Sequence, residues 1–386
     1  MLFATLLIAI AAAPAGEPWP MHVIDNTSIG ADGVRLADFD GDGHPDIATG
    51  WEEGGSIRVY HNPGPALAKE PWPSVVVGSV GSPEDAVLAD LDGDGAMDVI
   101  SCSEGKERKV WVHWAPANPA DYLNPEAWKT EALPAAENKA QWMFSLPMDI
   151  DGKHGIDIVA GAKNEGAAIG WFQAPENPRN LAAWRWLPLR EAGWVMSLIA
   201  NDMDKDGDQD VVYTDRRGPK RGAGWLENPG ASGGAWPDHT IGGADREVMF
   251  LTAAQFSAAG PTEWLCTTRD GGLLRFTPDE GGADWRTTEI PMPEGVGTGK
   301  GVAVVDITAD DLPEIIVSCE NAKETDGVFY LQNTADAWQP RAISGAPGTK
   351  FDLVVPYDMD GDGDLDVLTC EESERLGVIW YENPGR

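Results

Sequence analysis

The sequence predicts an all-β protein, a seven-bladed β-propeller whose blades each contain four strands. A nine-residue aspartate motif recurs along the 386 residues at intervals of about 52 residues. Each copy is accompanied by four short apolar runs of the kind that form strands. The chain also starts with a run that would complete the last, otherwise unfinished repeat. Four strands repeated at such a period are typical of propeller blades.

The repeated motif first occurs as DFDGDGHPD. Six copies are recognisable, and they begin at Asp38, Asp90, Asp149, Asp202, Asp306 and Asp358. The gap before the fifth of these (306 − 202 = 104 residues) spans two periods, so another copy is expected near residue 255. QFSAAGPTE, from Gln255 to Glu263, fits this place in a decayed form. Seven copies predict seven blades.

The four apolar runs follow one another in a constant order. One run leads into the motif (VRLADFD), a second follows it (DIATG), a third ends in an Asn-Pro tag (IRVYHNPG), and a fourth centres on tryptophan (AWPDHTI). They are short, β-branched or aromatic, and bounded by Gly, Pro and Asn, so we expect strands. A linear β-solenoid is the alternative, but its repeats are usually shorter.

The two ends of the chain predict how the ring closes. The last copy stops at VIWYENPGR, after its third strand, whereas the segment EPWPMHVID near the start has the pattern of a fourth strand. We therefore expect residues 18–25 to pair with the blade formed by residues 350–386, which removes two open sheet edges. This arrangement favours seven blades over six or eight, in one domain of residues 16–386.

The N-terminal segment has the features of a signal peptide over residues 1–15. Residues 2–13 are apolar but too few to span a bilayer, and small residues precede Gly16. A buried first strand is the alternative. No other segment is long and apolar enough to cross a membrane, so we expect a secreted or periplasmic protein.

The composition limits the partners and the chemistry. A net charge of −35 argues strongly against nucleic acid and weakly against anionic membrane surfaces. The four cysteines contain no CxxC pair, so a thiolate zinc site is not expected. They lie near the ends of equivalent strands in different repeats, which favours buried free thiols and leaves a Cys319–Cys370 bridge as a minor alternative.

The motif Asp-x-Asp-x-Asp-Gly-x-x-Asp is a set of oxygen ligands. Side chains at positions 1, 3, 5 and 9 and the carbonyl of position 7 can converge on one cation, and hard oxygen ligands without His or Cys favour calcium. Position 12 is Thr49 rather than Glu, which excludes an EF-hand. The ligands expected in the four complete copies are Asp38, Asp40, Asp42, His44, Asp46, Asp90, Asp92, Asp94, Ala96, Asp98, Asp202, Asp204, Asp206, Asp208, Asp210, Asp358, Asp360, Asp362, Asp364 and Asp366.

These loops resemble the FG-GAP/VCBS repeat propellers, the family that includes the head of integrin α chains. The resemblance covers essentially the whole chain after residue 15. It implies that each loop joins the first and second strands of a blade, binds calcium, and lies on the face away from bound partners. Two copies depart from the pattern, with Lys153 and His154 in one and Thr308 in the other, so their calcium occupancy stays open. The copy at Gln255 should hold no ion.

The loops of the opposite face are expected to form the mouth of the ring, where propellers generally hold ligands. Basic and tryptophan residues are frequent there in an otherwise acidic chain. The candidate ligand-binding residues are Trp142, Trp194, Arg216, Arg217, Arg246, Arg269, Lys300 and Lys350. Arginine forks suit carboxylate or sulfate oxygens, and an exposed tryptophan suits a sugar face. We expect a saccharide, or else a protein, as the ligand; structural ion pairs between blades are the alternative for each residue.

Catalytic motifs are not recognisable in the sequence. GxSxG, HExxH and phosphate-loop patterns are absent, and the six histidines occupy non-equivalent places. A ligand-binding module is therefore the first hypothesis. A propeller enzyme of the polysaccharide lyase or aldos-2-ulose dehydratase type, using the same mouth, is the second, and a structural adhesion module is the third. The ligand, turnover and oligomeric state stay open.

Overall fold

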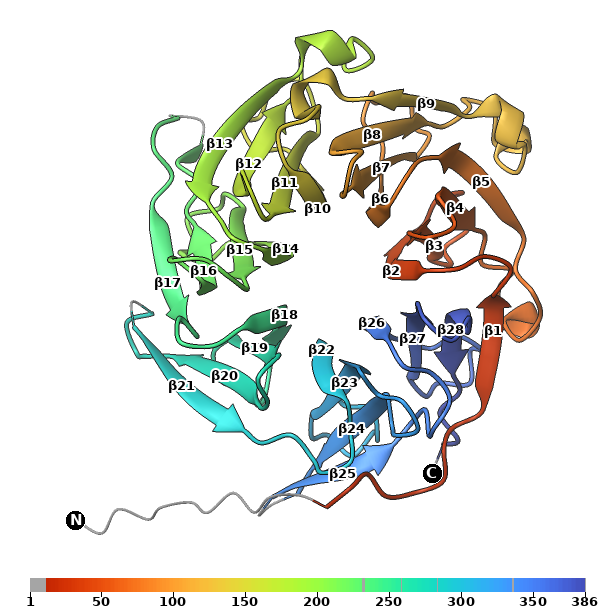
Figure 1. The fold of residues 1–386 in the computed structure, drawn as a ribbon, viewed down its shortest axis with the longest axis vertical. Coiled ribbons are helices and arrows are strands. Elements are labelled where there is room, and N and C mark those ends of the chain that lie inside the picture. Colours follow the sequence, from red (N-terminus) through yellow and green to blue (C-terminus); the bar gives the residue numbers. More distant parts are fainter. Residues whose placement is uncertain (1–11, 231–232, 258, 283, 335–336, 386) are drawn as a thin grey trace.

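The computed structural model describes residues 12–386, apart from residues 231–232, 258, 283, 335–336 and 386. In this part of the chain, 28 strands form seven antiparallel sheets of four strands. The sheets surround a central opening as the blades of a propeller, and the first strand of each blade is innermost (Figure 1). The prediction of an all-β, seven-bladed propeller is confirmed.

The first four blades take their strands in chain order from the centre outwards. Blade 1 contains β2 (Ala31–Ala37), β3 (Asp46–Trp51), β4 (Ser56–Tyr60) and β5 (Ser74–Ser79). Blade 2 contains β6 (Pro83–Ala89), β7 (Asp98–Ser103), β8 (Lys109–Trp114) and β9 (Lys129–Ala132). Blade 3 contains β10 (Gln141–Met148), β11 (Asp157–Lys163), β12 (Ala168–Gln173) and β13 (Arg185–Glu191). Blade 4 contains β14 (Val195–Asn201), β15 (Asp210–Asp215), β16 (Gly222–Leu226) and β17 (Asp238–Gly242).

The remaining blades follow the same order, except that the last one borrows its outer strand. Blade 5 contains β18 (Val248–Ala254), β19 (Glu263–Thr268), β20 (Leu273–Pro278) and β21 (Trp285–Ile290). Blade 6 contains β22 (Thr298–Val305), β23 (Glu314–Glu320), β24 (Val328–Asn333) and β25 (Trp338–Ala342). Blade 7 contains β26 (Phe351–Tyr357), β27 (Asp366–Glu371), β28 (Gly377–Tyr381) and β1 (Met21–Asp25).

Five short 3₁₀ helices lie wholly within the described residues, in connections of the first three blades. They are η1 (Pro65–Leu67), η2 (Pro119–Asp121), η3 (Pro125–Ala127), η4 (Pro134–Ala136) and η5 (Leu181–Ala183). Four of the five carry proline in the first turn, where its missing N–H costs no helical hydrogen bond.

The ring closes where the N-terminal strand meets the end of the chain (Figure 1). Strand β1 pairs antiparallel with β28, with Met21 opposite Tyr381 and His22 opposite Trp380. The indole of Trp380 stacks on the His22 ring at 4.4 Å between centroids. The closure expected from the two chain ends is therefore confirmed, and it leaves no blade with a missing outer strand.

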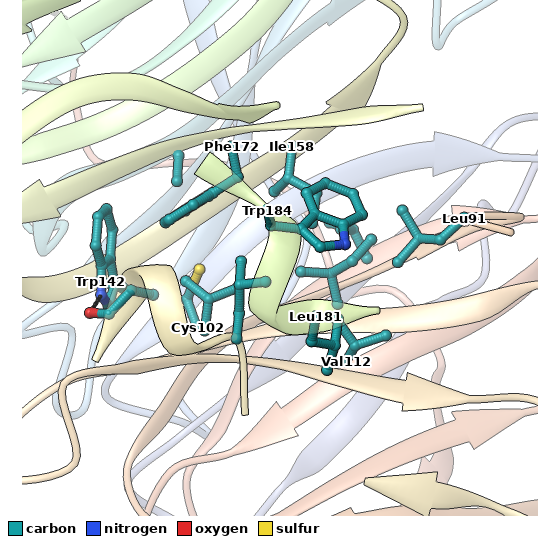
Figure 2. Packing of buried hydrophobic residues seen from close by; sticks show 14 of the residues in the cluster. Leu91, Cys102, Val112, Trp142, Ile158, Phe172, Leu181 and Trp184 are labelled. Atoms are coloured by element: carbon teal, nitrogen blue, oxygen red, sulfur yellow. Dashed lines mark hydrogen bonds between the residues drawn. The ribbon is translucent and has the colours of Figure 1, made fainter. Parts of the chain in front are cut away.

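The hydrophobic core lies mainly between neighbouring blades. Figure 2 shows one such layer between blades 2 and 3, where Cys102 and Val112 meet Ile158 and Phe172. Burying a large apolar side chain stabilises the fold by about 1.5–3 kcal/mol. Each blade therefore depends on its neighbours for burial, as in other repeat folds.

Two further sequence expectations concern the cysteines and the membrane. All four cysteines are buried and free, so the Cys319–Cys370 bridge is absent. None of the helices in the described part of the chain is long and apolar enough to cross a bilayer. The expected signal peptide, residues 1–15, falls largely on residues 1–11, which lie outside the described residues.

Candidate functional site

The aspartate loops occupy the connection between the first and second strands of their blades. The four complete loops join β2 to β3, β6 to β7, β14 to β15 and β26 to β27. The mouth residues lie at the opposite ends of the same strands, because they lie in or just before the start of the first strand, or at or just after the end of the second. The two sets of loops therefore lie on opposite faces of the ring, as expected from the sequence.

Backbone amides organise the side chains of each complete loop. In the first loop, Asp38 accepts hydrogen bonds from the backbone N–H groups of Gly41 (2.8 Å) and Gly43 (3.1 Å). Asp42 accepts one from the N–H of His44 at 2.8 Å. Gly41 and Gly43 have φ angles of 78° and 88°, a conformation that glycine adopts without strain. This turn brings the carboxylates together.

The carboxylates converge closely enough to share one cation. One oxygen from each of Asp38, Asp40 and Asp42 lies within 4.8 Å of the others. The same holds for the triad that begins at Asp90. Three acidic oxygens that accept backbone N–H groups suit a hard cation such as calcium. Positive side chains already lie beside some of these acids: Arg179 contacts Asp92 and Asp94, and His61 lies 3.2 Å from Asp40.

The acid at position 9 has a structural role that the sequence analysis did not foresee. Asp46 is buried, and its two oxygens accept the backbone N–H groups of Phe39 (2.7 Å) and Asn62 (2.8 Å). It thereby joins the aspartate loop to the Asn-Pro tag of the third strand. Burial raises the pKa of Asp46 to about 6. The same pair of hydrogen bonds recurs at Asp98, Asp157, Asp210 and Asp366.

Two of the departing loops contain groups that replace or neutralise the carboxylates of the motif. In the copy at Asp149, the ammonium of Lys153 lies 3.4 Å from Asp151, although Asp149, Asp151 and Asp157 still gather within 4.8 Å. In the copy at Gln255, the side-chain amide of Gln255 donates to the backbone oxygens of Ser257 (2.6 Å) and Gly260 (2.9 Å). The side-chain amide of Gln255 thus stabilises the loop by hydrogen bonds, and it stands where the complete copies have the first aspartate ligand.

The mouth contains a cavity of about 230 Å³. Its wall is charged, and buried Met and Phe side chains contribute its apolar part. The lining residues used below are Asp32, Glu52, Glu84, Glu104, Met143, Lys163, Trp194, Met196, Arg216, Met249, Arg269, Lys300, Glu320, Lys350 and Asp352. The cavity is smaller than the roughly 300–1,000 Å³ pockets that take drug-sized ligands, so it suits a small group.

Most of this wall derives from two sets of equivalent positions, one residue per blade. The second-strand ring lies six residues after position 9 of each motif and comprises Glu52, Glu104, Lys163, Arg216, Arg269, Glu320 and Glu372. The first-strand ring lies six residues before position 1 and comprises Asp32, Glu84, Met143, Met196, Met249, Lys300 and Asp352. All but Glu372 line the cavity, and Glu372 binds Lys300, which does.

Buried ion pairs join neighbouring blades across these rings. Lys300 of blade 6 lies 3.2 Å from Asp352 and 2.8 Å from Glu372, both of blade 7. Burial alone would lower the pKa of Lys300, but these two carboxylates outweigh it and hold the pKa well above its usual range. Lys350 also binds Glu372. Lys300 therefore makes the structural ion pairs between blades that are the alternative to ligand binding, whereas the pair of Lys350 with Glu372 lies within blade 7.

A group of three arginines, which we call the arginine cluster (Arg216, Arg217 and Arg269), surrounds one carboxylate. Glu247 lies 2.9 Å from Arg216 and 3.7 Å from Arg217. Burial alone would raise the pKa of Glu247, but the three guanidinium groups hold it below its usual value. Arg269 also lies 3.4 Å from Glu320. The cluster is thus a place where carboxylates are strongly favoured in the ionised form.

Trp194 lies beside the arginine cluster with cations around its indole ring. The ring centroid is 4.6 Å from Arg216, 4.7 Å from Arg217 and 4.8 Å from Lys163. Among the described residues, neither the Trp194 Nε1 nor the Arg216 Nη2 has a hydrogen-bond partner, although both atoms are buried. Unpaired buried donors are costly, so they mark a place where an added acceptor would be stabilised.

The structure separates the eight expected ligand residues into three groups. Trp194, Arg216, Arg269, Lys300 and Lys350 line the cavity, and Arg217 borders it through Trp194. Arg246 instead binds Asp270 (3.0 Å) and Glu289 (3.1 Å) within blade 5 and does not line it.

The expectation for Trp142 is corrected by its burial. Its side chain is only 1% exposed, packs between blades 2 and 3 (Figure 2), and donates from Nε1 to the Ala136 carbonyl at 3.1 Å. It offers no face to a ligand, because the inter-blade core needs a large apolar side chain there.

The acidic side of the mouth was largely missed from the sequence. Asp32, Glu104, Glu320 and Glu372 were not among the candidates, although Glu52, Glu84 and Asp352 lie in the loops expected to form the mouth. The signal that would have found them is the constant offset of six residues from the aspartate motif.

Comparisons with known proteins agree with this geometry. Residues 38–101, from the first aspartate loop into β7, match the family described as FG-GAP-like repeat. No curated protein matches the chain. Among solved structures, "Crystal structure of BBS1N in complex with ARL6DN, soaked with mercury" aligns with a TM-score of 0.54 and 10% identity, over 95% of this chain and 98% of that one. At that identity the likeness concerns the fold alone.

Proposed function

We propose that this FG-GAP/VCBS repeat propeller is an exported module that binds a ligand, a carbohydrate or a protein, at the mouth of its ring. The observation that carries the proposal is the charged cavity opposite the aspartate loops. Propellers offer such a mouth as a concave surface shared by all blades, and concave sites with a few polar groups are the usual places for ligands.

We further propose that the four complete loops hold calcium. The side chains at positions 1, 3 and 5 would be the main ligands, assisted by position 9 and the carbonyl of position 7. The ion would neutralise neighbouring carboxylates and hold the strand connection in one conformation. Extracellular calcium modules bind with Kd of about 0.1–1 mM, which suits an exported protein.

One observation favours an enzyme as the second candidate. Glu52 lines the cavity, and burial together with the Glu84 charge raises its pKa to about 7. A carboxyl group whose pKa lies near neutrality is suited to general acid–base chemistry. A lyase or dehydratase acting on an acidic sugar would use this group as its base, with the cations of the mouth beside the substrate carboxylate.

The binding proposal is tested by blocking the mouth with a bulky group. Arg217→Cys introduces a reactive thiol at the mouth, and Ser257→Cys introduces a matched thiol at the decayed loop on the opposite face. The four native cysteines are buried, so a maleimide label should react only with the new thiols.

Each labelled protein is screened in calcium on a glycan array and against candidate protein ligands. We expect the label at position 217 to abolish binding and the label at position 257 to leave it intact. Binding that survives the mouth label would sink the proposed location. Release of an unsaturated product from polyuronides, seen by its ultraviolet absorbance and lost in Glu52→Gln, would instead establish the enzyme.

A further inference from the structure

The two rings of the mouth divide it into two halves of different chemistry. In blades 3, 4 and 5 the second-strand ring is cationic throughout, with Lys163, Arg216 and Arg269. In the other four blades the same ring is acidic throughout, with Glu320, Glu372, Glu52 and Glu104. Like charges occupy consecutive blades although they repel one another, so the segregation runs against what ion pairing between neighbours would favour.

The first-strand ring changes at the same blades. Blades 3, 4 and 5 place Met143, Met196 and Met249 there, whereas the other blades place Asp32, Glu84, Lys300 and Asp352. Thioether side chains are polarisable and adapt to the shape of a ligand. The cationic half therefore combines positive charge with an adaptable apolar surface, and the acidic half is polar in both rings.

The cationic half also contains the unpartnered donors. Arg216 is 3% exposed and binds Glu247 through Nε, while its Nη2 has no partner among the described residues. The Nε1 of the neighbouring Trp194 is likewise without one. Because Glu247 already binds two guanidinium groups here, the chain itself shows which ligand chemistry the arginine cluster accepts.

In the acidic half, most carboxylates form ion pairs with lysines. Glu84 and Glu104 bind Lys163, and Asp352 and Glu372 bind Lys300. Glu52, by comparison, has no ion-pair partner within the described part of the chain. This half thus presents acceptors that suit hydroxyl or ammonium donors of a ligand.

We propose that the mouth selects a small organic acid, with its carboxylate or sulfate group against Arg216 and Arg269 and its hydrogen-bond donors toward Glu52. Arginine forks bind planar carboxylates through two hydrogen bonds, which lysine cannot reproduce. The cavity volume of about 230 Å³ limits the bound group to a single sugar-sized unit, such as one uronate residue. This inference rests on the proposed function and specifies its ligand.

The experiment uses isothermal titration of the full chain in calcium with four probes. Glucuronate carries both the anion and the donors, glucose 6-sulfate replaces the carboxylate by a sulfate, glucose has donors only, and inorganic sulfate is an anion only. We expect glucuronate or glucose 6-sulfate to bind at least about 10-fold more tightly than glucose and than inorganic sulfate, and the stronger of the two identifies the anion. Affinity should fall as salt is added.

Two variants locate the anion within the mouth. Arg269→Gln should weaken binding of the preferred acid by at least about 10-fold, because it removes a charge-assisted hydrogen bond. Arg286→Gln makes the same change on the exposed outer strand of the same blade and should leave the affinity unchanged. Thermal unfolding of both variants verifies that they are folded.

The outcomes separate this inference from the proposed function. Equal affinity for glucose and glucuronate, or unchanged affinity in Arg269→Gln, would overturn the selection of an acid but leave the mouth as a binding site. No heat with any of the four probes would also overturn it. The labelled-mouth experiment then decides separately whether the mouth binds a ligand of another class.

Discussion

The two faces of this ring are built from opposite ends of the same strands, yet they follow different rules. On the loop face, four copies repeat the same acidic motif, and the position-9 acid makes the same two backbone hydrogen bonds in five blades. On the mouth face, equivalent positions carry Glu, Lys, Arg, Asp or Met according to the blade.

The difference indicates that the residues of the two faces are restricted by different requirements. Under the proposed function, a loop that binds a cation and anchors a strand has few workable sequences, so its residues repeat. Under the same proposal, a mouth that encloses one asymmetric ligand has residues that diverge between blades. In a repeat protein, divergence at an otherwise equivalent position is therefore the stronger indication of a functional site.

The largest expected effect is on the loop face and comes from calcium removal. At 10 mM calcium and a Kd of about 0.1–1 mM, each occupied loop stabilises the fold by about 1.4–2.7 kcal/mol, or roughly 6–11 kcal/mol for four loops. We expect chelation to lower the melting temperature by about 7–13 °C, measured by calorimetry, because the unfolding entropy of a 386-residue chain is about 0.8 kcal/mol/K. Unchanged melting in chelator, with magnesium as the control cation, would contradict a calcium role.

The second effect is on the mouth face and should not depend on calcium. Lys300→Met leaves the buried carboxylate of Asp352 without its cation and Glu372 with Lys350 alone, which costs about 3–5 kcal/mol of unfolding free energy. The exposed pair of Lys129 and Glu131 provides the control, since Lys129→Met should cost less than about 1 kcal/mol. Denaturant unfolding with and without chelator measures both. Equal losses of unfolding free energy in the two variants would show that the buried ion pairs stabilise the fold no more than an exposed pair.

The third prediction separates the two roles inside one aspartate loop. Asp366→Ala removes the acceptor of two buried backbone N–H groups, from Met359 and Asn383, and should cost about 2–4 kcal/mol even in chelator. Asp362→Ala loses one exposed hydrogen bond to the N–H of Asp364 and should matter only when calcium is present. Identical behaviour of the two variants in chelator would disprove the structural role of position 9.

The smallest expected effect concerns the stability of the native state when Glu52 is ionised. Burial and the Glu84 charge raise the pKa of Glu52 to about 7, above its usual value of 4.5. Ionised Glu52 therefore destabilises the native state above pH 7, and this penalty disappears as the pH falls from 7 to 4.5. After a discount for its partial exposure, Glu52→Gln should add about 1 kcal/mol of stability at pH 8 and nothing at pH 5. A gain that is the same at both pH values would refute this assignment.

Much of the fold was predictable because repetition made weak local signals add up. A single run such as DIATG is ambiguous, but seven runs at one period, five of them followed by an Asn-Pro tag, leave few alternatives to a propeller. The pairing of β1 with β28 followed from counting strands at the two ends. The loop geometry followed from the motif, because aspartate and glycine spacing restricts the backbone locally.

The site was only partly predictable, because side-chain surroundings depend on contacts between distant segments. Trp142 and Trp194 look alike in the sequence, yet one fills an inter-blade layer and the other borders the cavity. Arg246 and Arg269 lie in the same blade, and only the second lines the mouth. Position 9 looked like a plain metal ligand, although its hydrogen bond to the Asn-Pro tag needs two strands to meet.

The sequence by itself determined the strand pattern, the number of blades, the closure of the ring and the face on which the acidic loops lie. These features depend on spacing and on residue types that act within a few positions. Only the tertiary structure decided which charges share the mouth, which are compensated, and which donors lack a partner. Such properties arise when seven blades bring side chains from across the chain into one small volume, where burial makes each charge depend on all the others.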